Sequence, residues 1–300
     1  MNCRRLPAAV ALLATLGPAG PSRLHAQALQ RSLYVSVLDD AGNPVPDLGV
    51  KDFVVREDNL AREVLRVAPA DAPMHVALLV DNSAYTSRYI RDFREAAKEF
   101  VLGMTSGPVK NEVAIIGIAE RPTLLADYTS DQKKLLSGVG RIFTQSQGGI
   151  YLLDAIYESA QALKKKEASR PVIVAMATDG QEFSNRYHDQ ILTALKGAGA
   201  AFHAVILGPP GAEDVRSTEG RERATALDEG TKTTGGRYDN VLAASALPAR
   251  MKQVANELTH QYLVTYARPD QLIPPEKTTV SAAKPGLIAR GTPVKDSGRP

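Results

Sequence analysis

The sequence predicts an α/β fold: a doubly wound, mostly parallel sheet flanked by helices, with a small β-rich module built from both ends of the chain. Two observations lead to this prediction. Continuously apolar runs such as 76–80 alternate with helix-patterned segments through the middle of the chain, as in a parallel sheet buried on both faces. Closely spaced strand patterns with no helix between them flank this region on both sides.

Residues 1–26 are typical of a secretory signal peptide. Arg4 and Arg5 form a basic start, a short apolar run follows, and Ala26 and Ala28 both suit cleavage. The run is too short for a permanent membrane span, which needs about 20 apolar residues. We therefore expect export to the periplasm, the cell envelope or the extracellular space, with a disordered N-terminus as the alternative.

The composition limits the chemistry of the mature chain. Of 36 basic and 33 acidic residues, three arginines and no acid lie in residues 1–26, so the mature chain is close to neutral. This balance argues against bulk attraction to nucleic acid or anionic lipid. The one cysteine, Cys3, also lies in that segment. We therefore expect no disulfide, no thiolate metal site and no thiol nucleophile after cleavage.

Residues 31–68 predict an N-terminal antiparallel β module. Strand-forming stretches at 33–38, 53–55 and 64–67 are separated by turn-rich segments. Residues 68–73 then predict a linker.

Residues 74–259 carry the alternating pattern of the α/β domain. Buried strands are predicted at 76–80, 113–118, 172–176 and 202–207, with a short strand at 123–125. Helices with an apolar stripe are predicted around 90–100, 135–142, 153–163, 191–195 and, more weakly, 224–227. Ser245 is expected to cap a last helix that carries Pro248 in its first turn.

Residues 260–300 predict a C-terminal β extension, with strands near 261–266, 278–282 and 287–290. Because the two ends of a domain usually lie close together, we expect this extension to pack with residues 31–68.

Ligands of doubly wound sheets bind at the carboxyl ends of the strands, beside the switch point. Three loops at this edge carry specific residues. The first strand ends in Asp81-Asn82-Ser83-Ala84-Tyr85, the helix near 153 follows Gly148-Gly149-Ile150, and the strand at 172–176 leads into Thr178-Asp179-Gly180.

In this order and spacing, the three loops resemble those of von Willebrand factor A domains, over about residues 74–259. The flanking β segments, the Thr234-Gly235-Gly236 step and the strand at 261–266 are similar to a bacterial secreted branch of that family. The resemblance implies a Rossmann-like sheet and a non-enzymatic protein-binding role.

The resemblance also implies a metal-ion-dependent adhesion site (MIDAS), in which oxygen ligands hold a divalent cation such as Mg²⁺. This sequence keeps Asp81, Ser83 and Asp179 of that motif. Tyr85 stands where the family has a second serine, and Ile150 stands where it has a threonine. We therefore expect a degenerate site, with Mg²⁺ or Mn²⁺ bound weakly or not at all, so no cofactor is certain.

Other patterns do not predict an enzyme. His203 falls inside a strand away from the ligand edge, and His188 and His260 fall near helix ends. The sequence has neither a Gly-x-Ser-x-Gly elbow nor a phosphate-binding Gly-x-x-x-x-Gly-Lys loop after a strand.

The leading hypothesis is an exported module that binds a protein through the loops at the carboxyl edge, with no nucleic-acid partner and no transmembrane segment in the mature chain. The expected contact positions are Asn82, Gly148, Gly149 and Gly180. One alternative is a structural cell-envelope scaffold without metal, in which the β module makes the contacts. Another is a hydrolase with an unrecognised site.

Overall fold

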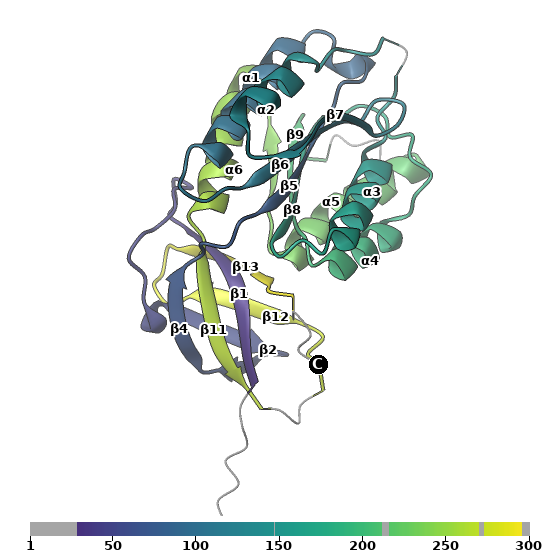
Figure 1. The fold of residues 1–300 in the computed structure, drawn as a ribbon. Coiled ribbons are helices and arrows are strands. Elements are labelled where there is room, and N and C mark those ends of the chain that lie inside the picture. The colour runs from purple at the N-terminus through teal and green to yellow at the C-terminus, as the bar shows by residue number, and fades with distance from the viewer. Residues whose placement is uncertain (1–28, 147, 212–215, 270–272, 296–300) are drawn as a thin grey trace, which may run out of the picture.

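The computed structural model describes residues 29–146, 148–211, 216–269 and 273–295. An α/β domain lies on top of a smaller β module, and the chain passes from the module into the domain and back again (Figure 1). The predicted signal peptide at 1–26 lies outside the described residues.

The central sheet of the α/β domain has the strand order β10-β9-β8-β5-β6-β7. Its strands are β5 (His75–Val80), β6 (Glu112–Gly117), β7 (Thr123–Thr129), β8 (Pro171–Thr178), β9 (Ala201–Leu207) and β10 (Tyr238–Val241). Only β7, at one edge, pairs antiparallel to its neighbour. All residues of β8 and β9 are buried, as the unbroken apolar runs predict.

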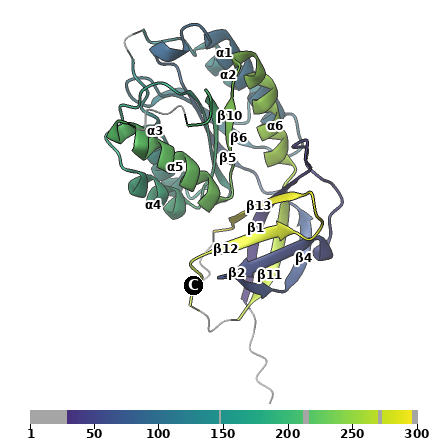
Figure 2. The same ribbon diagram turned by 180° about the vertical axis from the view of Figure 1, so that it is seen from behind.

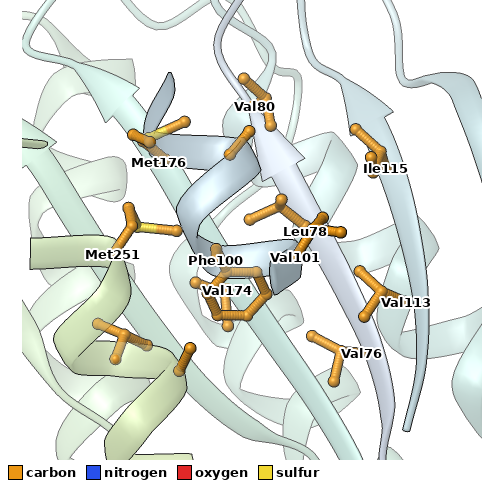
Figure 3. Packing of buried hydrophobic residues seen from close by; sticks show 14 of the residues in the cluster. Val76, Leu78, Val80, Phe100, Val101, Val113, Ile115, Val174, Met176 and Met251 are labelled. Atoms are coloured by element: carbon orange, nitrogen blue, oxygen red, sulfur yellow. The ribbon is translucent and has the colours of Figure 1, made fainter. Parts of the chain in front are cut away.

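Helices cover both faces of this sheet (Figure 2). One face carries α1 (Ile90–Thr105), α2 (Gln132–Gly140) and α6 (Leu247–Thr259), and the other carries α3 (Leu152–Lys165), α4 (His188–Ala198) and α5 (Thr218–Thr234). Successive side chains of a strand point to opposite faces. Leu78 therefore packs with Phe100 and Met251 on the first face, as Figure 3 shows, and Leu79 belongs to the second core. The prediction of a doubly wound domain is confirmed.

Two elements of this domain differ from the prediction because their sequences carry little apolar signal. The α5 helix is much longer than residues 224–227 suggest, since its buried face is built largely from small residues such as Gly220, Ala226 and Gly230. The edge strand β10 was not predicted, and its sequence Tyr-Asp-Asn-Val is mostly polar.

The predicted cap of the last helix is wrong. Ser245 lies in a separate short 3-10 turn, η3 (Ala244–Ala246), and the α6 helix begins at Leu247 with Ala246 at its N-cap and no side-chain cap bond. Pro248 does lie in the first turn, where the missing backbone N–H costs nothing.

The β module contains a four-stranded sheet of order β13-β1-β11-β4 and a three-stranded sheet of order β12-β2-β3. The N-terminal strands are β1 (Leu29–Leu38), β2 (Phe53–Glu57), β3 (Leu60–Arg62) and β4 (Val64–Pro69). The C-terminal strands are β11 (Tyr262–Arg268), β12 (Thr278–Ala282) and β13 (Ile288–Pro293). Strands from both sheets share one core that includes Val35, Val55 and Val264. The predicted β module from both termini is therefore confirmed; β3 was not predicted, and β4 runs two residues into the expected linker.

Arg170, just before β8, ties the two parts together. Its buried guanidinium donates to the carbonyl oxygens of Ala72 (3.1 Å) and Leu258 (3.0 Å) and to Oε1 of Gln261 (2.6 Å). It also lies 4.6 Å from the centroid of the Tyr34 ring in the β module. These contacts lie at the amino ends of the parallel strands, so the carboxyl edge of the sheet faces away from the β module (Figure 1).

Within the described residues, no helix combines the length and the apolar character that crossing a membrane requires.

Candidate functional site at the carboxyl edge of the sheet

The switch point of the sheet lies between β5 and β8. After β5 the chain continues to β6 and β7 on one side, and it then crosses to β8 on the other side. The two strands run parallel, with Val80 opposite Met176. Asp81 and Thr178 therefore reach the same edge. The loop that holds Gly149 lies beside the Asp81 loop, because Ala84 donates its backbone N–H to the carbonyl oxygen of Gly148 (3.0 Å).

Asp81 is fully buried and its carboxylate is occupied by donors of the chain itself. One oxygen accepts the backbone N–H of Ser83 (2.9 Å). The other accepts both the backbone N–H (3.0 Å) and the hydroxyl (2.7 Å) of Thr178. Burial of a carboxylate is costly unless such donors compensate it, so these bonds explain how Asp81 can lie inside the domain without a cation.

Ser83 is also fully buried, but its hydroxyl has no hydrogen-bond partner among the described residues. Its carbonyl oxygen accepts the hydroxyl of Thr86 (2.8 Å), which fixes the turn η2 (Ala84–Thr86). A buried hydroxyl without a partner is uncommon and is satisfied by a water or a ligand in most proteins. Ser83 is therefore the one motif residue with free ligating capacity inside the site.

Asp179, in contrast, is exposed. Its backbone N–H donates to the carbonyl oxygen of Leu207 at the end of β9 (3.1 Å). Its side chain lies against Gly208, where a β-carbon would come within 2.6 Å of Oδ2. The structure thus separates the two motif acids by environment, with Asp81 held inside the edge and Asp179 on its surface.

The two residues that replace family ligands give the edge an apolar character. Tyr85 is 43% exposed, and its ring covers the backbone of Gly180. Ile150 is completely buried in the core between β5, β8 and α3, and its backbone bridges Ala119 and Glu182. A hydrocarbon in that position supplies no ligand oxygen.

A second aromatic residue covers the glycine loop. The ring of Phe183, 45% exposed, lies where a β-carbon of Gly149 would be, and it stacks on Tyr151 with 6.2 Å between ring centroids. Gly148 lies close to Ala119, whose β-carbon would be 3.0 Å from a β-carbon added at Gly148. Glycine at these positions is needed because the rings and the neighbouring chain fill the space of a side chain.

Asn82 stabilises the edge from within. It is buried, its Oδ1 accepts the backbone N–H of Ala119 (3.0 Å), and its Nδ2 donates to the carbonyl oxygen of Phe143 (3.3 Å). Of the contact positions expected from the sequence, Asn82 therefore joins three loops and does not present its side chain to solvent.

A buried ion pair below the acidic loop was not predicted from the sequence. Arg223, from α5, donates to the carbonyl oxygens of Gly180 (2.8 Å) and Thr178 (2.5 Å), and its Nε lies 4.0 Å from Oε2 of Glu182. Glu182 accepts the backbone N–H of Leu152 (3.0 Å) at the start of α3, and burial raises the pKa of its carboxyl. Arg223 stands in a charged, helix-patterned segment that looks solvated, so nothing in the sequence marks it.

The residues present do not complete the shell of an octahedral cation. The Asp81 carboxylate accepts hydrogen bonds from Thr178, the Ile150 side chain is hydrocarbon, and the Tyr85 ring packs on the acidic loop. The Ser83 hydroxyl and the Asp179 carboxylate are the remaining ligands of the motif. In the part of the chain that the structure describes, no three His, Cys, Asp or Glu side chains cluster as a metal site.

The three histidines noted in the sequence lie away from this edge or at the ends of helices. His203 is buried in β9, His188 begins α4 and bonds Glu222 (2.6 Å), and His260 ends α6. The Nδ1 atom of His260 lies 3.2 Å from the Thr259 hydroxyl and 2.8 Å from the carbonyl oxygen of Asn256, both at the end of the same helix.

Comparison with known proteins finds a family match over part of the α/β domain. Residues 76–181 match the von Willebrand factor type A domain. No curated protein matches the sequence. The fold is a Rossmann-like, doubly wound domain with the candidate site at the carboxyl edge of its sheet. The family match covers less than half of the chain, and over these residues the protein is similar to a von Willebrand factor type A domain.

Several solved structures are similar to parts of this chain. A von Willebrand factor type A protein from Catenulispora acidiphila is 11% identical (TM-score 0.49), and the match covers 91% of this chain and 74% of that one. Proximal thread matrix protein 1 from the mussel byssus is 13% identical (TM-score 0.49; 64% of this chain), and the present chain spans only 50% of its length. Another structure of the mussel protein has a zinc-occupied MIDAS motif. The vWF domain of the type V pili tip protein Mfa5 from Porphyromonas gingivalis is 11% identical (TM-score 0.46), with 62% of this chain and 95% of that one covered.

Proposed function

We propose that the protein is an exported, non-enzymatic module that binds a protein partner at the carboxyl edge of its sheet, and that this binding does not depend on a metal ion. The contacts come from the loops around Asp81, Gly149 and Asp179. In this proposal the MIDAS motif is degenerate, and aromatic side chains replace the cation as the central contact.

The aromatic rings on the two glycine loops carry the proposal. Tyr85 lies on Gly180 and Phe183 lies on Gly149, and both rings are close to half exposed. Tyrosine is among the residues that dominate binding energy in protein interfaces, and aromatic residues are enriched there. Rings already packed against backbone lose little freedom on binding, which lowers the entropic cost of association.

The ion pair of Arg223 and Glu182 supports the same role. It anchors the acidic loop and the start of α3 from below, so the rings rest on a fixed base. Binding residues on loops positioned by a rigid scaffold are the usual arrangement in interaction domains.

Export is part of the proposal because the basic start and short apolar run of residues 1–26 match a signal peptide. Mass spectrometry of the protein from its native host tests it: a mature chain that begins near Ala26 or Ala28 supports export. A cytosolic protein with an intact Met1 contradicts it.

Affinity capture from the cell-envelope fraction tests the binding role. The bait is the mature chain, compared with Phe183→Ala and with Leu60→Ala, which removes an even more exposed apolar side chain from β3 of the β module. We expect wild type and Leu60→Ala to capture the same partner, and we expect Phe183→Ala to lose it. Loss of the partner in Leu60→Ala alone would instead favour a scaffold that works through the β module.

A further inference from the structure

Beside the aromatic rings lies a patch of unpaired arginines that the proposed function does not use. Residues 84–94, which lead from the Asp81 loop into α1, contain three arginines and a single acid, Asp92. Arg88 and Arg91 are exposed and form no ion pair with any described residue. Arg88 lies in the turn before α1, and Arg91 lies in the first turn of that helix.

The third arginine, Arg94, joins this segment to the end of α2. Its Nε donates to the carbonyl oxygen of Ile142 (2.6 Å), and its guanidinium lies 4.4 Å from the centroid of the Phe143 ring. This contact brings Arg141 and Phe143, both exposed, next to the start of α1. Arg141 also forms no ion pair within the described residues.

The patch is continuous with the proposed binding edge. Asn82 donates to the carbonyl oxygen of Phe143, and the hydroxyls of Thr86 and Thr144 lie 3.4 Å apart. We call the surface formed by Tyr85, Arg88, Arg91, Arg141 and Phe143 the arginine face. It combines exposed aromatic rings with three exposed arginines that form no ion pair within the described residues, and the Arg88 guanidinium lies 6.0 Å from the centroid of the Tyr89 ring.

We propose that the arginine face recognises an acidic segment of the partner protein, with carboxylates paired to the three arginines and apolar side chains against Tyr85 and Phe143. This inference rests on the proposed function and adds the chemistry of the partner to it. Free guanidinium groups bind carboxylates through charge-assisted, often bidentate hydrogen bonds. Complementary charge of this kind selects a partner and speeds its association.

An acidic protein segment fits this face better than nucleic acid does. The positive charge is local, since the mature chain as a whole is close to neutral, and nonspecific nucleic-acid binding depends on a wide basic surface. The exposed ring of Phe143 is held by Arg94 and flanked by Arg141, which matches the aromatic and arginine composition of protein-binding hot spots.

Fluorescence anisotropy with the mature chain tests the proposal directly. The probe is a labelled peptide that alternates glutamate with phenylalanine, and the control peptide has glutamine in place of every glutamate. We compare wild type with the triple variant Arg88→Gln/Arg91→Gln/Arg141→Gln. The matched control, Lys133→Gln/Lys134→Gln/Lys196→Gln, removes three exposed charges that also form no ion pair among the described residues. Circular dichroism confirms that both variants fold.

We expect the acidic peptide to bind wild type and the lysine control alike, and the arginine variant to bind it about tenfold more weakly, with added salt reducing the difference. Equal binding of the glutamine peptide, or an arginine variant that binds as wild type does, would overturn the inference. Tighter binding of single-stranded DNA through the same arginines would overturn it as well.

The capture experiment separates this inference from the proposed function. If the acidic peptide does not bind while Phe183→Ala still loses the captured partner, the acidic specificity is wrong and the binding edge stands. If Phe183→Ala retains every partner of wild type, the binding edge falls and this inference falls with it.

Discussion

The ring of Tyr85 lies on the backbone of Gly180, so that a β-carbon at Gly180 would be 2.5 Å from Cδ2 of the ring. This contact joins the loops after β5 and β8, the two loops that supply acidic residues to the family motif. It also explains why the loop has glycine at this position. A side chain of the first loop therefore packs directly on the backbone of the second.

The first prediction concerns the two acids of the motif. Asp81→Ala leaves three buried donors of Ser83 and Thr178 without an acceptor, so we expect the free energy of unfolding to fall by about 3 kcal/mol. Asp179→Ala removes an exposed side chain and should change it by less than about 0.5 kcal/mol. Urea denaturation of both variants measures the difference. Equal effects would contradict the structural role of Asp81.

The second prediction concerns metal affinity. We expect wild type to bind Mg²⁺ or Mn²⁺ no better than about millimolar, or about −4 kcal/mol, because Ile150 has no ligand oxygen and the ring of Tyr85, which packs on Gly180, holds its hydroxyl away from the position of a serine oxygen. The double variant Tyr85→Ser/Ile150→Thr should bind more tightly than either single variant, since Ser83 and Asp179 are already present. Isothermal titration calorimetry decides the matter.

Ile150 is fully buried, so the double variant needs a stability control. A melting curve must show that it is folded at the temperature of the titration, and Ile150→Val serves as the matched variant that loses packing without gaining a hydroxyl. Micromolar binding by wild type would show that other oxygens complete the shell. No gain in a folded double variant would show that the loops no longer have metal-binding geometry.

The third prediction is a pH dependence of stability that arises from His203. Both ring nitrogens of this buried residue lack hydrogen-bond partners among the described residues, and burial lowers its pKa, although Glu257 from α6 opposes the shift. Arg290, Asp239 and Arg237 also act on the ring electrostatically. The unfolded chain, in which the pKa is about 6.5, therefore takes up a proton first as the pH falls.

Stability should consequently decrease as the pH falls below about 6.5. His203→Leu removes this contribution, so its free energy of unfolding should decrease less than that of wild type between neutral and mildly acidic pH. Urea titrations at several pH values give both slopes, and titrating groups that are not coupled to His203, as Glu257 is, cancel in the comparison. Parallel slopes would show that His203 carries no such linkage.

The fourth prediction treats residues 31–68 and 260–300 as one unit. The strand β11 lies between β1 and β4 and pairs with both, so deletion of residues 260–300 removes the shared partner of the two N-terminal strands. Unpaired strand edges are prone to exchange and aggregation. We expect residues 31–68 to lose hydrogen-exchange protection and to become protease-sensitive. Unchanged exchange in this segment would show that the two segments are independent.

The sequence predicts those strands and helices whose apolar residues form a clear pattern. The buried runs at 76–80, 172–176 and 202–207 became β5, β8 and β9, because a strand covered on both faces has to be apolar throughout. The helix α5 and the strand β10 were missed or shortened because small and polar residues make up their packing surfaces.

The candidate site was predictable in position but not in its contacts. The loop motifs placed Asp81, Ser83 and Asp179 at one edge of the sheet. No sequence pattern indicates that Thr178 donates to the Asp81 carboxylate, or that Arg223 reaches the acidic loop from α5. Both contacts join segments far apart in the chain, and no local pattern encodes them.

We propose that the aromatic edge binds its partner without a cation. The most direct test is the affinity of the captured partner for the mature chain, measured by surface plasmon resonance in excess EDTA and again in excess Mg²⁺. We predict dissociation constants that agree within about twofold and a loss of about tenfold or more for Phe183→Ala in both buffers. Binding that disappears in EDTA and returns with Mg²⁺ would contradict the account.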